Sequence, residues 1–203
     1  MPSKIVWLTL LSLLGLAPMA LAGVEPLVPL GKVNPRIRQE LRYATKNNFT
    51  HQVVYNFNAC YLLPEVAAAL SKVQVELEKS KLGLKVWDCY RPMSAQQKFW
   101  QLVPDPRYVS PPSKGGLHTR GTAVDLTLVD TKGQEMKMPT EFDDFSPAAA
   151  RRAPQTPAEA RRNSLILEAA MQRHGFVGLA TEWWHYDFTS WKQHPPLKIE
   201  IRP

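Results

Sequence analysis

Two short stretches of the sequence carry residue types suited to binding a divalent metal. His118 is followed seven residues later by Asp125, and His185 has Glu182 three residues before it. Catalytic zinc sites typically take three protein ligands from His, Asp or Glu and leave a fourth position to water. His118, Asp125 and His185 would supply two nitrogens and one oxygen. The sequence therefore predicts a metal site, provided that the fold brings the two stretches together.

Glu182 is the candidate general base of such a site. A catalytic metal lowers the pKa of a coordinated water from about 15.7 to about 7, and a base within hydrogen-bond reach must then accept its proton. The short link between Glu182 and His185 keeps this carboxylate near the metal. Each pair taken singly also fits a solvated ion pair, and Trp183 and Trp184 fit simple core packing. The combination of both pairs with glycine-rich loops favours a hydrolytic metal centre.

The local backbone must place these residues. The glycines around His118 predict a loop, because glycine adopts conformations that other residues avoid. Residues 122–128 alternate as a strand, with Asp125 on the face opposite Val124. A regular strand would put Glu182 and His185 on opposite faces, so we expect the chain to bend between them.

These residues resemble a known family. The sequence is similar to the zinc D-alanyl-D-alanine dipeptidases of the VanX type, within the wider group of zinc D,D-peptidases. The pattern of that group is Ser-x-His-x-x-Gly-x-Ala-x-Asp, followed by Glu-x-x-His. The matching residues are His118, Gly121, Ala123, Asp125, Glu182 and His185.

Further segments extend the resemblance from about residue 34 to about residue 190. Residues 43–49, with the sequence Tyr-Ala-Thr-Lys-Asn-Asn-Phe, and residues 88–92, with the sequence Asp-Cys-Tyr-Arg-Pro, are typical of the dipeptidase branch. One position departs from the family pattern, because Gly116 stands where the pattern has serine. That serine lies beside the substrate in the family, so its loss leaves the metal unaffected but puts the fine substrate preference in question.

The resemblance implies roles for two further residues and one cofactor, a single Zn²⁺ per chain. Arg91 would stabilise the negative charge that develops on the carbonyl oxygen during amide hydrolysis; an ion pair with Asp88 is the alternative. Asp143 would hold the substrate ammonium group. Asp144 is the alternative for that role. It is also possible to explain Asp143 as an acidic residue of a turn that has no role in binding.

The implied reaction is zinc-dependent hydrolysis of the D-alanyl-D-alanine dipeptide. The residues alone indicate only a metallohydrolase. A D,D-carboxypeptidase acting on peptidoglycan stem peptides and a non-catalytic zinc-containing cell-wall binding module remain alternatives. The expected partners are a small D,D-dipeptide and peptidoglycan fragments. The net charge of +7 comes without a nucleic-acid-binding motif, so we expect no nucleic-acid partner and a weak attraction to anionic cell-wall material.

Residues 1–22 have the pattern of a secretory signal peptide. Lys4 provides the positive start, residues 5–16 form an apolar run too short to span a bilayer, and Ala20-Leu21-Ala22 fits a cleavage site before Gly23. An uncleaved anchor is the alternative. We therefore expect a single catalytic domain over residues 23–203, located in the periplasm or secreted, without stable membrane insertion after cleavage.

Export allows disulfide bonds, and Cys60 and Cys89 are the two cysteines of the chain. We expect them to pair, which would close a loop worth about 3–4 kcal/mol of stability. Two buried free thiols are the alternative.

The expected fold is α+β, with helices packed on a small, mainly antiparallel sheet, as in the zinc D,D-peptidase (hedgehog-like) fold that the resemblance implies. Apolar spacing predicts a helix over residues 64–79, and a capping box of Ser94 and Gln97 predicts a second helix to residue 102. A third helix is expected from Thr156 to about residue 174. Its expected buried residues are Leu165, Ile166, Ala169, Ala170 and Met171. Strands are expected over residues 84–87, 122–128 and 181–188, a short helix over residues 35–43, and a peripheral tail from residue 191.

Overall fold

A five-stranded sheet is the centre of the molecule in the computed structural model, which describes residues 27–201. The strand order is β2-β4-β5-β7-β6, with β2 parallel to β4 and the other neighbours antiparallel. A separate two-stranded ribbon pairs β1 with β3. The α+β class and the mainly antiparallel sheet are therefore confirmed, whereas the proposed signal peptide lies outside the described residues.

The elements follow one another along the chain with short connections, apart from three longer stretches at residues 45–60, 103–117 and 131–157, the last of which contains one 3₁₀ turn. The helices and 3₁₀ turns are α1 (Leu30–Val33), η1 (Arg42–Ala44), α2 (Pro64–Glu78), α3 (Met93–Leu102), η2 (His118–Arg120), η3 (Pro147–Ala149), α4 (Ala158–Arg173) and η4 (Thr189–Gln193). The strands are β1 (Val28–Pro29), β2 (Arg38–Gln39), β3 (Tyr61–Leu62), β4 (Leu82–Asp88), β5 (Ala123–Asp130), β6 (Phe176–Gly178) and β7 (His185–Phe188).

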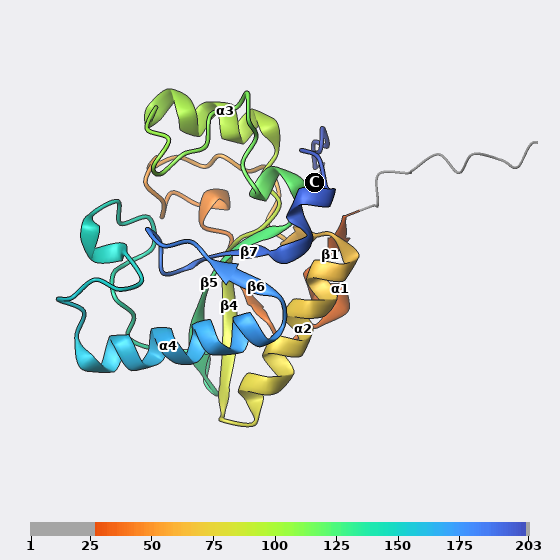
Figure 1. Ribbon diagram of the computed structural model, residues 1–203. Helices are drawn as coiled ribbons and strands as arrows, with labels where there is room; N and C mark the ends of the chain where they lie inside the picture. The colour runs from red at the N-terminus through yellow and green to blue at the C-terminus, as the bar shows by residue number, and fades with distance from the viewer. Residues whose placement is uncertain (1–26, 202–203) are drawn as a thin grey trace, which may run out of the picture.

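Helices α2 and α4 pack on the sheet and on each other, whereas α3 lies apart from them at one end of the sheet (Figure 1). Residues 123–129 of β5, the central strand of the sheet, are buried on both faces. Among the described residues, no helix combines the length and the apolar character needed to cross a membrane.

Helix α4 buries Ala170 and Met171, as expected, but leaves Leu165 and Ile166 exposed. Leu165 is 46% exposed and Ile166 is 38% exposed, whereas Leu167, Ala170 and Met171 are buried. Asn163, Ser164 and Glu168 complete the buried side. The apolar spacing allowed two neighbouring stripes, and the contact with β5 and β6 selects the one that includes Leu167.

Two expected local features are wrong. Residues 35–43 form β2 and the start of η1 instead of a helix. Helix α3 begins at Met93 after Pro92 and has no side-chain cap, so Ser94 lies inside the first turn. The Ser94 hydroxyl donates a hydrogen bond to Glu200 at 3.0 Å.

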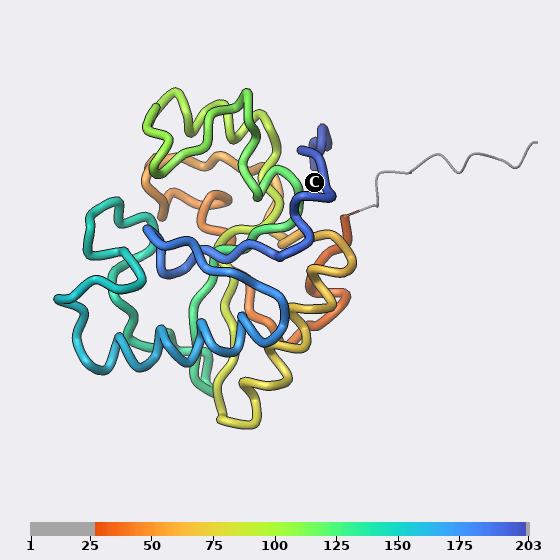
Figure 2. Tube along the Cα trace, viewed as in Figure 1, coloured from red at the N-terminus to blue at the C-terminus, as the bar shows by residue number. Residues whose placement is uncertain are grey.

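The tail after η4 packs against the rest of the domain, contrary to the expectation of a peripheral segment. Leu197 is buried, and its backbone N–H donates to the carbonyl oxygen of Thr119 at 2.8 Å. The Tyr90 hydroxyl donates to the carbonyl oxygen of Ile199 at 2.7 Å. Figure 2 shows this last stretch beside the segment around residue 119. The tail therefore supports the turn that carries His118.

Candidate metal centre and active site

His118, Asp125 and His185 converge at one end of the sheet. His118 begins η2, Asp125 lies in β5, and His185 is the first residue of β7, where the strand register pairs it with Asp125. His118 Nε2 lies 3.1 Å from His185 Nδ1 and 3.3 Å from Asp125 Oδ2. All three residues are buried, and one ligand atom from each lies within 4.8 Å of the others. This donor set fits a single zinc ion with an open fourth position.

The remaining nitrogen of each imidazole is occupied by a protein acceptor. His118 Nδ1 donates to the carbonyl oxygen of Cys89 at 2.7 Å, and His185 Nε2 donates to Asp187 Oδ1 at 2.8 Å. Such contacts fix the ring orientation and the tautomer of metal-binding histidines. They leave His118 Nε2 and His185 Nδ1 facing the common point, which supports the fit of the residues to a metal ion.

The charges of the centre are strongly coupled. Burial disfavours the imidazolium form of His185, but Asp187 and Asp125 raise its pKa well above the usual value. Burial disfavours the ionised form of Asp125, but His118 and His185 hold the pKa of this carboxyl well below its usual range. The positive charge of the His185 imidazolium therefore lies between these two carboxylates, where a cation is stabilised.

Two glycines give His118 its position. Gly121 has a φ of 71° and Gly115 a φ of 62°, a region that favours glycine. A Cβ at Gly121 would lie 2.7 Å from Leu27 Cδ2, and one at Gly115 would lie 2.7 Å from Pro196 Cγ. The turn that carries His118 can therefore pack closely only with glycine at both positions.

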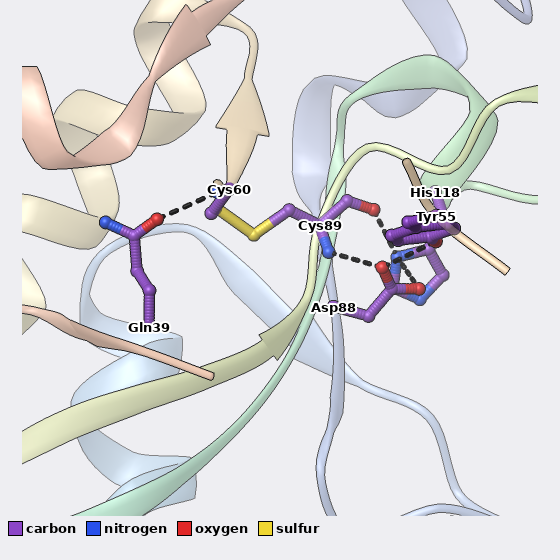
Figure 3. Close-up of a disulfide and its surroundings, with 6 residues drawn as sticks. All are labelled: Gln39, Tyr55, Cys60, Asp88, Cys89 and His118. Carbon is purple, nitrogen blue, oxygen red and sulfur yellow. Dashed lines mark hydrogen bonds and ion pairs between the residues drawn. A yellow bond between two sulfur atoms is a disulfide. The ribbon is translucent and has the colours of Figure 1, made fainter. Parts of the chain in front are cut away.

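The Cys60–Cys89 disulfide lies next to the metal centre (Figure 3). It joins the start of β3 to the residue whose carbonyl oxygen holds His118. The backbone N–H of Cys60 donates to Gln39 Oε1 at 2.8 Å. The bond therefore fixes the end of β4 where Asp88 and Arg91 also reach the site.

Glu182 lies in the turn between β6 and β7, which is the bend that the sequence required. Its backbone N–H donates to the Leu179 carbonyl oxygen at 3.4 Å, and that of the following Trp183 donates to the Ala149 carbonyl oxygen at 3.0 Å. Glu182 lines the same cavity as His185. Burial raises the pKa of Glu182 to about 7, while the nearby His185 charge opposes the increase. A carboxyl group whose pKa lies close to neutral pH is suited to accept a proton and to return it.

Arg91 follows β4 and lines the cavity. Its Nη2 donates to Asp88 Oδ2 at 2.8 Å, its Nε donates to the same oxygen at 3.1 Å, and its Nη1 donates to Gln96 Oε1 at 3.1 Å. The guanidinium carbon lies 4.8 Å from the centre of the Phe99 ring. Arg91 therefore forms the ion pair with Asp88 and lines the cavity at the same time, so the two roles considered for it are compatible.

Asp88 is itself held firmly beneath Arg91. Its Oδ1 accepts hydrogen bonds from the Tyr55 hydroxyl at 2.8 Å and from the Cys89 backbone N–H at 2.9 Å. Asp88 is fully buried, so the guanidinium has a rigid anionic partner on its inner side.

Asp143 also lines the cavity, in a left-handed backbone conformation with a φ of 60°. The Tyr43 hydroxyl donates to its Oδ1 at 3.0 Å, and the Phe49 backbone N–H donates to its Oδ2 at 3.3 Å. Burial and the charge of Asp125 raise the pKa of Asp143 to about 8. Asp144 accepts a hydrogen bond from the Ser146 N–H at 2.8 Å and lies outside the cavity lining, so Asp143 is the acid that faces the site.

The cavity has a volume of about 200 Å³ and contains the metal centre, Arg91 and Asp143. Its outer wall is formed by residues 106–110, and Gly116 is also part of the lining. A Cβ at Gly116 would lie 3.4 Å from Gln96 Oε1 and 3.7 Å from the Ser110 side chain, which is ordinary contact. The absence of a serine at this position therefore leaves space in the wall.

Some site residues were missed by sequence reasoning. Asp187 stands two residues after His185 on the same strand, a spacing that could have indicated a partner for the imidazole. Gln96 and Tyr43 gave no such signal, because their contacts join segments that are distant in the sequence. His174, which follows the last residue of α4 away from the site, contacts Glu76 of α2 at 2.9 Å.

Comparisons with known proteins agree with this geometry. A family model described as D-ala-D-ala dipeptidase matches residues 24–195. The D-alanyl-D-alanine dipeptidase of Escherichia coli K12 is 39% identical over 177 residues, covering 87% of this chain and 92% of the relative. The enzyme of the same name from Streptomyces coelicolor is 32% identical over 189 residues, covering 81% of this chain and 92% of the relative.

A solved structure gives a weaker match. The vancomycin resistance D,D-pentapeptidase VanY in complex with Zn(II) aligns with a TM-score of 0.42 and 14% identity, covering 68% of this chain and 78% of that chain.

Proposed function

The chain belongs to the D-alanyl-D-alanine dipeptidase family, and from this premise we infer that it is a zinc metallopeptidase that hydrolyses D-alanyl-D-alanine to two molecules of D-alanine. The convergence of His118, Asp125 and His185 on one buried point is the observation that carries the inference. These three residues would hold one zinc ion. When bound, zinc supplies a Lewis acid for the substrate carbonyl and an activated water nucleophile.

Glu182 acts as the proton carrier of the reaction. Its carboxylate accepts a proton from the attacking water, and the carboxylic acid then donates a proton to the nitrogen of the leaving D-alanine. The raised pKa of this buried group, about 7, supports a role in which it alternates between the two forms near neutral pH. Within residues 27–201, the Glu182 carboxylate lines the cavity without a side-chain hydrogen bond, so it can face the substrate.

Arg91 stabilises the negative charge that develops on the carbonyl oxygen. Its partners Asp88 and Gln96 hold the guanidinium in place before the substrate arrives. A charge that is already oriented needs no reorganisation during the reaction, so it favours the transition state over the ground state.

Asp143 holds the free ammonium group of the dipeptide. The raised pKa of about 8 keeps the Asp143 carboxyl largely protonated near pH 7 until the substrate ammonium pairs with it and favours the carboxylate form. A stem peptide has an amide at the corresponding position and offers no such charge, so Asp143 selects for the dipeptide. The cavity of about 200 Å³ is smaller than the roughly 300–1,000 Å³ of pockets that bind drug-sized ligands. Both features favour a small zwitterionic substrate, and peptidoglycan fragments would be secondary partners at most.

We propose that the catalytic domain, residues 23–203, is exported to the periplasm or beyond. The leader-like residues 1–22 and the Cys60–Cys89 disulfide support this location, because disulfides persist in oxidising compartments. Mass spectrometry of the protein recovered from the periplasm or the medium should give a chain that starts at Gly23. A chain that retains Met1 and stays in the cytoplasm would contradict the proposal.

The substrate assignment is tested by comparing three compounds with the zinc-loaded protein. D-alanyl-D-alanine should be hydrolysed efficiently, and both N-acetyl-D-alanyl-D-alanine and a stem pentapeptide should have values of kcat/KM at least about 100-fold lower. Asp143→Asn should reduce this preference mainly by raising KM for the free dipeptide. Faster cleavage of the pentapeptide would instead identify a carboxypeptidase, and a zinc-loaded protein without peptidase activity would favour the binding module.

A further inference from the structure

Gln96 joins the catalytic arginine to the outer wall of the cavity. This residue lies in α3, is completely buried, and lines the cavity. Its Oε1 accepts the hydrogen bond from Arg91 Nη1 at 3.1 Å. Because Asp88 binds Nε and Nη2 of Arg91, Gln96 holds the other edge of the planar guanidinium. The two partners together set the direction in which the guanidinium plane points.

The amide nitrogen of Gln96 is used as well. Its Nε2 donates to the carbonyl oxygen of Ser110 at 2.7 Å. Ser110 belongs to the mouth loop, defined here as residues 103–117, which connects α3 to η2 and supplies residues 106–110 to the cavity wall. One buried amide therefore contacts both the arginine and the mouth loop.

The orientation of this amide is determined by its two partners. Arg91 offers only donors and the Ser110 carbonyl only an acceptor. A flipped amide would set NH₂ against the guanidinium and oxygen against the carbonyl oxygen, leaving four polar groups without partners, two of them on the buried Gln96. Movement of the mouth loop away from Gln96 would therefore also disturb the hydrogen bond to Arg91.

We propose that Gln96 is a positioning residue that couples the orientation of Arg91 to the closed position of the mouth loop. The coupling means that the guanidinium is fully aligned only when the wall of the cavity is in place around a substrate. This inference rests on the dipeptidase function proposed above, because its effect is read through hydrolysis.

The first test replaces the amide by an apolar side chain of similar length. Gln96→Met removes both hydrogen bonds and should lower kcat for D-alanyl-D-alanine about 10-fold, equivalent to about 1.4 kcal/mol of barrier. Gln74→Met is the matched control. Gln74 is another buried glutamine, whose side chain joins Leu84 and Glu78 away from the site. This control should lower thermal stability but leave kcat within about twofold of the wild type.

A double-mutant cycle separates positioning from general damage. In an Arg91→Ala background, Gln96→Met should cause no further loss of kcat, because the group that it positions is missing. Gln96→Glu retains an acceptor for Arg91 but loses the donor to the mouth loop. Because the loop contact that completes the alignment of Arg91 is lost, Gln96→Glu should recover only part of the kcat lost in Gln96→Met, with a raised KM and faster proteolysis within residues 103–117.

Two results would overturn the inference while the wild type remains an active dipeptidase. One is an equal loss of kcat from Gln96→Met with and without Arg91. The other is a kcat of Gln96→Met that matches the wild type. A wild type that fails to hydrolyse the dipeptide would instead overturn the proposed function.

Discussion

Removal of the Cys60–Cys89 disulfide should destabilise both the fold and the metal centre. The bond joins residues 29 positions apart, so the chain-entropy relation gives a loss of about 3.6 kcal/mol in the free energy of unfolding at 25 °C. For a domain of this size, about 2–4 °C of Tm are lost per kcal/mol. We therefore expect Cys60→Ala/Cys89→Ala to melt about 7–14 °C below the wild type.

The assay is urea unfolding in the presence of a chelator, because bound zinc would add its own stabilisation to the folded state. The wild type measured under reducing conditions is the control, since it keeps both sulfur atoms and loses only the cross-link. Agreement between the reduced wild type and the double variant would assign the effect to the cross-link, and a larger loss in the variant would assign the difference to packing.

The same variant should also bind zinc more weakly, because the cross-link holds in place the Cys89 backbone, whose carbonyl oxygen orients His118. A loss of 10-fold or more in zinc affinity is expected from the effects of such supporting contacts. If the variant unfolds at the same urea concentration as the wild type and retains its zinc affinity, the structural role given to this bond is wrong.

Three further predictions concern the site. Asp187→Asn should weaken zinc binding about 10- to 100-fold, as measured by competition with a chelator, and an unchanged dissociation constant would contradict the role of its hydrogen bond to His185. Zinc binding near pH 7 should release protons, because the raised pKa keeps His185 protonated in the metal-free chain and the metal takes the neutral form. Affinity should therefore rise with pH; calorimetry in buffers of different ionisation enthalpy tests this, and zero proton release would oppose it. Gly116→Ser should change the free energy of unfolding by less than about 1 kcal/mol, since its Cβ has ordinary contacts; a Tm lower by more than about 5 °C would show that the wall has no room.

The metal ligands could be predicted from sequence because the chemistry restricts them to a few residue types. His118 and Asp125 lie close together in the chain, and the Glu182–His185 spacing required a bend that the turn before β7 provides. The strand that carries Asp125 was also recognisable from its apolar alternation. These features depend on local sequence, which is why they could be inferred before the structure was known.

The supporting contacts could not be predicted, because they join distant segments. Gln96 meets Ser110 through a loop that has no regular pattern, and Tyr43 reaches Asp143 across 100 residues of sequence. The capping box predicted at Ser94 is absent for a related reason, because the Ser94 hydroxyl donates its hydrogen bond to the distant residue Glu200 in the tail. In α4, Leu165 was expected to be buried and Leu167 was not considered, and the packing against the sheet buries Leu167 instead.

Zinc titration of the metal-free protein is the most direct test of the central claim that His118, Asp125 and His185 hold the catalytic ion. D-Alanine release from D-alanyl-D-alanine should be absent after chelation and should return in proportion to added zinc, reaching its maximum at about one ion per chain. His118→Ala should remain folded and fail to recover activity at that ratio. Full activity in the chelated protein, or in the His118→Ala variant, would contradict the account.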